Sequence, residues 1–197
     1  MGFRLFGIDI SFSFWFFAVL SVFLVLGREV LAVYMILPIA IHECGHLIAM
    51  VVCRVGIEGI AFTAFSVDIK RSGAATGSYG RDIFVCLGGV IANVITAVCF
   101  YFFTFQSMRV MFFIAVNIAI AAFNIMPVGN LDGGQILRLV LERFGNPATA
   151  YRISRVFSFV ILIPIFALAI FLMMRDFANI SLLLACIYLA CVVVFRD

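Results

Sequence analysis

Residues 41–46 read Ile-His-Glu-Cys-Gly-His and lie inside an apolar run that extends over residues 31–52. The two histidines of the chain, His42 and His46, both belong to this stretch, and Glu43 directly follows the first of them. On a helix, residues four positions apart lie on one face, roughly 6 Å apart along the axis. Two imidazoles placed in this way can bind one zinc ion, and the adjacent glutamate can act as a general base on a water molecule at the metal.

The apolar setting of these groups is unusual. Ionisable side chains within a membrane-length helix cost on the order of several kcal/mol, so a chain keeps them only where something compensates that cost. A metal site is one compensation, and hydrogen bonds to other helices of a bundle are the alternative. The chain has 10 acidic residues and 2 histidines, and one of these acids lies between the two histidines, so we interpret the motif as functional. Cys44 would point about 200° away from His42 and is not a candidate ligand.

The composition indicates an integral membrane protein. The 197 residues are 66% hydrophobic and 12% charged, with a mean hydropathy of +1.26, whereas a soluble domain is about 45–50% apolar and about 25% charged. The net charge of +3 is spread along the chain, which argues against nucleic acid as a partner. The 6 cysteines form no CxxC pair, and we interpret them as reduced, small apolar residues.

The apolar segments predict an all-α polytopic fold of about six transmembrane helices, because a spanning helix needs about 20 largely apolar residues. The segments cover residues 10–26, 31–52, 83–105, 110–131, 156–174 and 178–195. Between the second and third segments, residues 56–70 alternate loosely with a period of two. This pattern predicts a small strand or hairpin, whose edge could hold an extended peptide by main-chain hydrogen bonds. Residues 142–155 are expected to form a connection.

The basic residues predict the orientation in the membrane. Six spans place both termini on one side, and that side collects ten basic residues against three on the other. The ten are Arg4, Arg54, Lys70, Arg71, Arg81, Arg138, Arg143, Arg152, Arg155 and Arg196, and the three are Arg28, Arg109 and Arg175. Both termini are therefore expected in the cytosol, and the histidine motif in the cytosolic half of the membrane.

A catalytic zinc ion usually takes three protein ligands and a water molecule, so a third ligand is needed. Asp132 is the best candidate, because it follows the fourth apolar segment at a similar depth and Pro127 breaks the helix before it. The alternative is that residues 124–134 form an ordinary loop, in which Asp132 caps a helix that starts at Gly133.

Residues 87–93 read Leu-Gly-Gly-Val-Ile-Ala-Asn and lie in the third apolar segment. Gly88 and Ala92 form a small-xxx-small pair, which lets helices approach closely. A buried Asn93 needs hydrogen-bond partners, and both a functional role and bonding to another helix remain open. Cys53 lies about 10 Å from His46 along the helix, and we regard it as structural.

These three elements together resemble the site-2 protease family (M50) of intramembrane zinc metalloproteases. The elements are the HExxH motif, the Gly-Gly-Val-Ile-Ala-Asn of residues 88–93, and the Asn-Ile-Met-Pro-Val-Gly-Asn-Leu-Asp-Gly-Gly of residues 124–134. The resemblance implies that His42, His46 and Asp132 bind one zinc ion and that Glu43 is the general base. It also implies that Asn93 and Asn124 position the substrate peptide or stabilise the oxyanion.

The compact chain is most similar to the stage IV sporulation protein FB branch of that family. The resemblance implies one transmembrane protease domain over residues 1–197, with a catalytic core at about 31–141 and without PDZ or CBS domains. The expected substrate is a membrane-tethered protein, such as a pro-sigma or anti-sigma factor, cleaved near the cytosolic face of a bacterial cell membrane. The lipid bilayer and a regulatory membrane protein are the other expected partners.

Two other functions fit some of these residues. A metal-ion transporter also carries His and Asp within its spans, but it is expected to offer several sites along a path, whereas this chain has one cluster. A non-catalytic membrane chaperone derived from a protease could keep the metal ligands by descent, but the intact Glu43 argues against that alternative.

Overall fold

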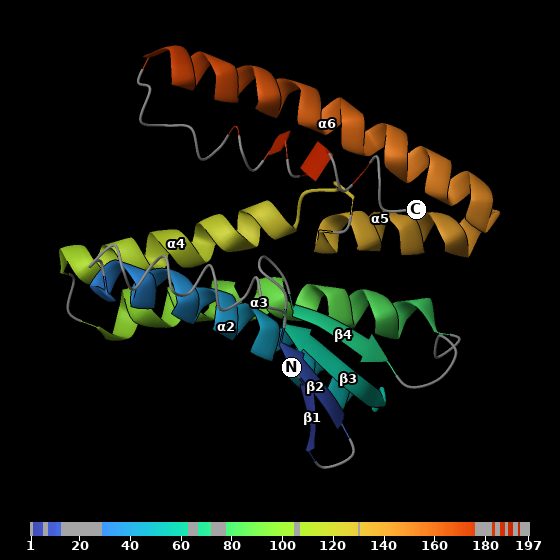
Figure 1. The fold of residues 1–197 in the computed structure, drawn as a ribbon, viewed down its shortest axis with the longest axis horizontal. Helices are drawn as coiled ribbons and strands as arrows, with labels where there is room; N and C mark the ends of the chain where they lie inside the picture. The colour runs from blue at the N-terminus through green and yellow to red at the C-terminus, as the bar shows by residue number, and fades with distance from the viewer. Residues whose placement is uncertain are drawn as a thin grey trace. The chain divides into compact units, whose positions relative to one another are not determined.

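The structure is a computed structural model that describes residues 2–5, 8–12, 29–62, 67–71, 78–104, 107–129 and 131–175, together with 183, 186–187, 189–190 and 193. The chain divides into two compact units, Met1–Ala121 and Ala122–Asp197. The strands are β1 (Gly2–Leu5), β2 (Ile8–Phe12), β3 (Ile57–Phe62) and β4 (Val67–Arg71). The helices are α2 (Glu29–Val52), α3 (Tyr79–Phe103), α4 (Met108–Asn124), α5 (Asp132–Phe144) and α6 (Pro147–Arg175) (Figure 1).

Helices α2 and α3 form the centre of the first unit and pack through small residues. A Cβ atom built on Gly88 would lie 2.6 Å from the carbonyl oxygen of Gly45 and 2.8 Å from the Cβ atom of Ala49. One built on Gly45 would lie 2.6 Å from the Cβ atom of Ala92. The two backbones thus approach more closely than any larger side chain allows, which confirms the predicted packing role of Gly88 and Ala92.

Helix α2 ends in a Schellman motif. Arg54 adopts a positive φ of 54°, the amide of Val55 donates to the carbonyl of Met50 (2.9 Å), and the amide of Arg54 donates to that of Val51 (3.1 Å). Met50 and Val55 also belong to one buried apolar cluster, as this motif requires. The turn therefore ends α2 about two helical turns beyond the second histidine.

A four-stranded sheet belongs to the same unit (Figure 1). Its order is β1-β2-β3-β4: β1 and β2 are antiparallel, β2 and β3 parallel, and β3 and β4 antiparallel with a register shift between Ile57 and Gly59. The strand or hairpin expected at residues 56–70 falls on β3 and β4. Since β3 is paired on both sides, its edge is not available to a peptide, and the free edges of the described sheet are those of β1 and β4.

The helices agree with the predicted helical class, whereas the strands β1 and β2 differ from the prediction. The predicted first span at residues 10–26 begins inside β2. Its remaining part, residues 13–26, lies outside the described residues. Residues 8–12 carry a period-two pattern, because Ile8, Ile10 and Phe12 alternate with the polar Asp9 and Ser11. This pattern overlaps the start of the apolar segment at residues 10–26 and is therefore easily assigned to it.

Six membrane spans are not supported. Within the described residues, three helices are long and apolar enough to cross a membrane, Val33–Val52, Tyr79–Phe103 and Pro147–Met174, and they indicate a membrane protein. Helix α4 has 17 residues and ends at Asn124 instead of continuing to 131. The reason is Pro127, which disfavours helical backbone before it and lacks an amide donor. Most of the predicted sixth span, 178–195, lies outside the described residues.

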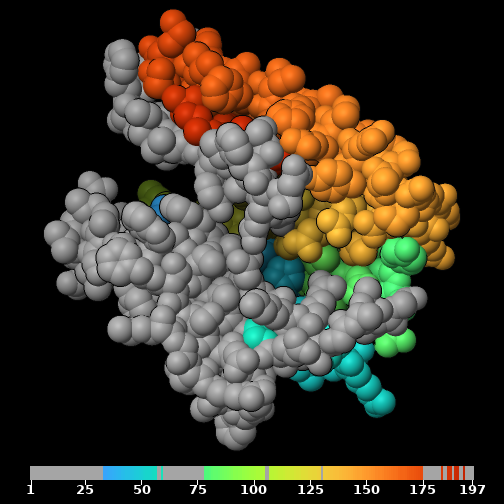
Figure 2. Space-filling view, turned by 45° about the vertical axis from the view of Figure 1, so that its right-hand side comes forward, coloured from blue at the N-terminus to red at the C-terminus, as the bar shows by residue number. Residues whose placement is uncertain are grey.

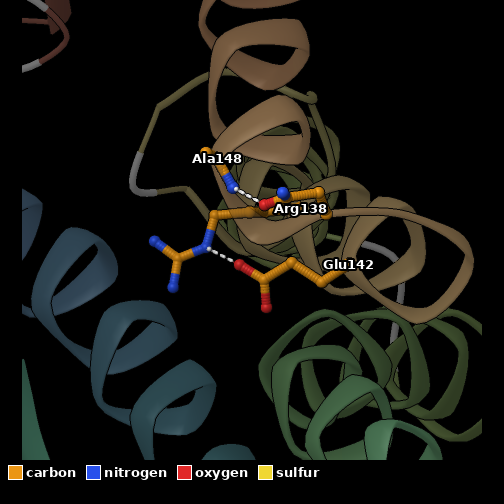
Figure 3. Close-up of polar contacts among 4 residues, drawn as sticks. Arg138, Glu142 and Ala148 are labelled. Carbon is orange, nitrogen blue, oxygen red and sulfur yellow. Dashed lines mark hydrogen bonds and ion pairs between the residues drawn. The ribbon is translucent and has the colours of Figure 1, made fainter.

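In the second unit, α5 and α6 follow the loop after α4. The expected connection at residues 142–155 is wrong, because α5 continues to Phe144 and α6 begins at Pro147. Proline suits the first helical position, and the Oδ1 atom of Asn146 accepts from the amide of Ala148 (2.9 Å) as a helix cap. Figure 3 shows this region, in which the Nε atom of Arg138 also contacts Oε1 of Glu142 at 3.0 Å.

Apolar side chains lie exposed along α6. Val156, Val160 and Ile163 are each exposed, and Figure 2 shows α6 as the orange part of the surface. The opposite side of the helix contributes Leu162 to a buried cluster with Val128, Leu189 and Val193. A helix that is apolar on its exposed side as well as on its buried side suits contact with lipid.

Candidate metal centre

The two histidines of the HExxH motif lie together on one face of α2, as their spacing predicts. Their Nε2 atoms are 3.1 Å apart, and their rings meet edge to face, with 4.7 Å between the centroids. Nδ1 of His46 lies 2.7 Å from the carbonyl oxygen of Val85 on α3. Because a carbonyl oxygen only accepts hydrogen bonds, Nδ1 of His46 carries the proton, and its Nε2 presents a lone pair toward His42.

This geometry fits a shared metal ion. Zinc–nitrogen bonds are about 2.0–2.1 Å long, so two nitrogen ligands of one tetrahedral zinc ion are separated by about 3.3 Å. The observed 3.1 Å between the Nε2 atoms is close to that separation. The carbonyl of Val85 is also the kind of outer partner that orients a metal-binding histidine. The residues of α2 therefore fit a zinc site.

Gly89 of α3 contributes the space around the imidazoles. A Cβ atom built on Gly89 would lie 2.5 Å from Nε2 of His46 and 2.7 Å from Nε2 of His42. Helix packing is the expectation from the sequence for the adjacent glycines Gly88 and Gly89. It is correct for Gly88, whereas Gly89 lies against the imidazoles. Neighbouring helical residues point about 100° apart, so a second glycine next to a packing glycine signals a second close approach.

Glu43 lies next to His42 on α2 and is partly buried. Cys44 is exposed, which agrees with the expectation that it points away from the histidines. Cys53 packs against the apolar cluster of Ala49, Met50, Val55 and Val85. This contact confirms the structural role predicted for Cys53.

Asn93 is completely buried on α3, with 0% of its surface exposed. It follows Gly89 by four residues and therefore lies on the same face of α3, one turn along. Neither amide atom of Asn93 has a hydrogen-bond partner within the described part of the chain, so the alternative of a bond to another helix is not found there. An unsatisfied buried amide costs about 1–3 kcal/mol.

Asn124 and Asp132 both belong to the second unit, at the two ends of one loop. Asn124 is the last residue of α4, and Asp132 is the first residue of α5 and is 8% exposed. Leu131 occupies the cap position, so the alternative in which Asp132 caps a helix starting at Gly133 is not supported. The carboxylate lies at a helix N-terminus, where the helix dipole stabilises negative charge.

The glycines after Asp132 let α5 begin directly against that loop. A Cβ atom built on Gly133 would overlap the carbonyl of Ile125, and one built on Gly134 would lie 2.8 Å from the carbonyl oxygen of Val128. The amide of Leu131 donates to the same Val128 carbonyl (3.0 Å). These contacts hold the first turn of α5 in one place, and Asp132 with it.

Comparison with known proteins agrees with these features. The model of Peptidase family M50 matches residues 104–168, a part that contains Asn124 and Asp132 but not the HExxH motif. Among solved structures, the chain is similar to the Site-2 Protease from Methanocaldococcus jannaschii, with a TM-score of 0.69 and 19% identity over 98% of this chain and 93% of that one. The two chains share a fold. No curated protein matches the sequence.

Proposed function

We propose that this protein is an intramembrane zinc metalloendopeptidase. The observation that carries the proposal is the histidine pair, whose Nε2 atoms lie 3.1 Å apart on a helix that is apolar and long enough to cross a membrane. The M50 match and the shared fold support the same class of enzyme. The HExxH motif and the M50 match fall on different parts of the chain, so the two lines of support are separate.

The proposed metal ligands are His42, His46 and Asp132. These residues supply nitrogen and oxygen donors of the kind that zinc prefers. Three protein ligands leave one position open, which is the arrangement of catalytic zinc sites. The chain has only these two histidines, so a single metal site is proposed, which favours an enzyme over a transporter with several sites along a path.

Glu43 is the proposed general base. The chemistry that bound zinc supplies here is Lewis acidity, which lowers the pKa of a water molecule and polarises a carbonyl group. Glu43 accepts the proton of the attacking water and later delivers it to the leaving amine. Asn93 and Asn124 are proposed to position the substrate peptide or to stabilise the oxyanion. The buried amide of Asn93, which has no hydrogen-bond partner within the described residues, supports that role.

The proposed substrate is a membrane-tethered protein that unfolds locally before it is cut. Main-chain hydrogen bonds to a free strand edge could hold such an extended peptide, and β4 offers an edge in the described sheet. Pro-sigma and anti-sigma factors are the candidate substrates, as in the stage IV sporulation protein FB branch. The basic residues favour a cell membrane with cleavage near the cytosolic face.

The first prediction concerns Glu43. Candidate membrane-tethered proteins are co-expressed with wild type and with Glu43→Gln, and both enzymes are purified for measurement of zinc content. We expect the cleavage product with wild type only, and equal zinc in both, because glutamine keeps the shape of the side chain but cannot accept the proton. Undiminished cleavage by Glu43→Gln would remove Glu43 from the reaction.

A further inference from the structure

Ser158 of α6 is a buried hydroxyl that connects two distant parts of the second unit. It is 1% exposed. Its Oγ–H donates to the carbonyl of Ser154 (2.8 Å), and its Oγ accepts from the amide of Gly129 (2.8 Å). The first bond stays within α6, whereas the second reaches the loop between α4 and α5. Ser158 thereby uses its donor and an acceptor in a helix that is otherwise largely apolar.

The partner of Ser158 is the residue at which that loop turns. Gly129 has a φ of +47°, a conformation that disfavours side chains. A Cβ atom built on Gly129 would also lie 2.8 Å from Val193. Its amide cannot join a regular helix in this conformation, so the hydroxyl of Ser158 supplies the bond that the backbone cannot.

The backbone of Gly129 is in direct contact with the first turn of α5. Gly134 packs so closely against the carbonyl of Gly129 that a Cβ atom on Gly134 would overlap it. The amide of Gln135 donates to the carbonyl of Leu131 (3.0 Å), which closes the first turn of α5. Asp132 lies between these contacts. A shift of Gly129 would therefore move the backbone that carries the Asp132 carboxylate.

We infer that Ser158 is a positioning residue for Asp132: its hydroxyl holds the Gly129 turn so that the carboxylate reaches the metal. This inference rests on the proposed function of Asp132 as a metal ligand. Ser158 lies outside the three motif elements of the sequence, and its contact with the loop exists only in the folded chain. Groups that bond directly to a metal ligand typically contribute 10–100-fold to metal affinity. Ser158 acts on Asp132 through the Gly129 backbone, so we expect an effect at the lower end of that range.

The test compares metal binding by the full-length protein in detergent. Zinc affinity is measured by chelator competition for wild type, Ser158→Ala, Ser158→Thr and the control Ser154→Ala. The coordination geometry is followed by the absorption spectrum of the cobalt-substituted protein. Ser154 is a matched control, because it is a buried serine one turn away on α6 that contributes its backbone carbonyl to this network.

We expect Ser158→Ala to weaken zinc binding about 10-fold and to alter the cobalt spectrum. Ser158→Thr should retain the wild-type zinc affinity and cobalt spectrum, because it keeps the hydroxyl. Ser154→Ala should resemble wild type in both measurements. Wild-type affinity and spectrum in Ser158→Ala would overturn the inference. If Ser158→Ala does not fold, Ser158→Cys replaces it, since its weak sulfur acceptor should give a smaller loss in the same direction, and an unchanged affinity there would also overturn the inference.

Two further variants separate this inference from the proposed function. In Asp132→Ala we expect loss of zinc binding, and the double variant Asp132→Ala with Ser158→Ala should bind no more weakly than Asp132→Ala alone. Full zinc affinity in Asp132→Ala would refute the proposed ligand itself. Loss in Asp132→Ala together with wild-type behaviour of Ser158→Ala would refute only the positioning role.

Discussion

At the residue scale, the histidine pair combines a local and a non-local feature. The spacing of His42 and His46 is local and needs only a helix. The orientation of His46 is non-local, because it depends on the Val85 carbonyl of α3. Gly89 adds a second non-local feature, since the imidazoles occupy the space that its side chain would fill.

The second prediction concerns Gly89. Gly89→Ala should weaken zinc binding at least 10-fold, because its methyl group would displace the imidazoles from their common point. The melting temperature should be retained or increased, since alanine is favoured over glycine in a helix by about 1 kcal/mol. The measurements are zinc affinity and thermal unfolding of the purified protein.

Two matched glycines of the same helix serve as controls for Gly89. Gly80→Ala should leave zinc affinity unchanged and should retain or increase the melting temperature, because nothing lies within 4 Å of the added atom. Gly88→Ala should lower the melting temperature instead, because its methyl group would meet the backbone of α2. Wild-type zinc affinity in Gly89→Ala would show that the imidazoles do not need this space.

At the element scale, the sheet restricts the proposed peptide-binding edge, predicted for residues 56–70, to β4. Strand β3 has partners on both sides, so a proline in β3 would disrupt the sheet itself and could not test peptide binding. Amide groups along a strand point alternately to its two sides. Of two neighbouring residues in β4, one therefore donates toward β3 and the other toward the free edge.

The third prediction uses this alternation in β4. Of the variants Asp68→Pro and Ile69→Pro, one should reduce substrate cleavage while zinc content and melting temperature stay at the wild-type level, because it removes a donor from the free edge. The other should lower the melting temperature, because it removes a donor from the pairing with β3. Cleavage at the wild-type rate in both variants would argue against peptide binding at β4.

At the scale of the whole molecule, the orientation in the membrane rests on the distribution of charge. Four basic residues flank the loop between α5 and α6, namely Arg138, Arg143, Arg152 and Arg155. The loop after α3 has one basic residue nearby, Arg109. Both loops contain exposed residues, Gly145 and Thr104 respectively. We propose that α4, an apolar helix of 17 residues and thus at the lower limit of a membrane span, also crosses the membrane, which puts these two loops on opposite sides.

The fourth prediction tests that topology. In a variant whose native cysteines are replaced by serine or alanine, Gly145→Cys should react with a membrane-impermeant thiol reagent only in inside-out vesicles. Thr104→Cys should react only in right-side-out vesicles, because it follows α3 and precedes α4, and the proposed crossing of α4 separates it from Gly145. The reverse pattern would place the loop between α5 and α6 outside the cytosol and contradict the assignment from basic residues.

The sequence by itself determined the membrane class, the helix of the HExxH motif and the packing of Gly88, because each follows from composition or from spacing along one helix. It did not predict β1 and β2, since the short period-two pattern at residues 8–12 runs into the apolar segment at residues 10–26. It also misjudged the end of α5 and the start of α6, although Pro147 and the Asn146 cap are local signals.

Only the tertiary structure decided the features that join residues distant in the chain. The Val85 carbonyl at His46, the closeness of Gly89 to the imidazoles and the Ser158 bond to Gly129 all connect different helices or a helix and a loop. No periodicity along the chain reports such contacts. Their physical basis is close packing, which brings one backbone or hydroxyl group within hydrogen-bond distance of a group far away in the sequence.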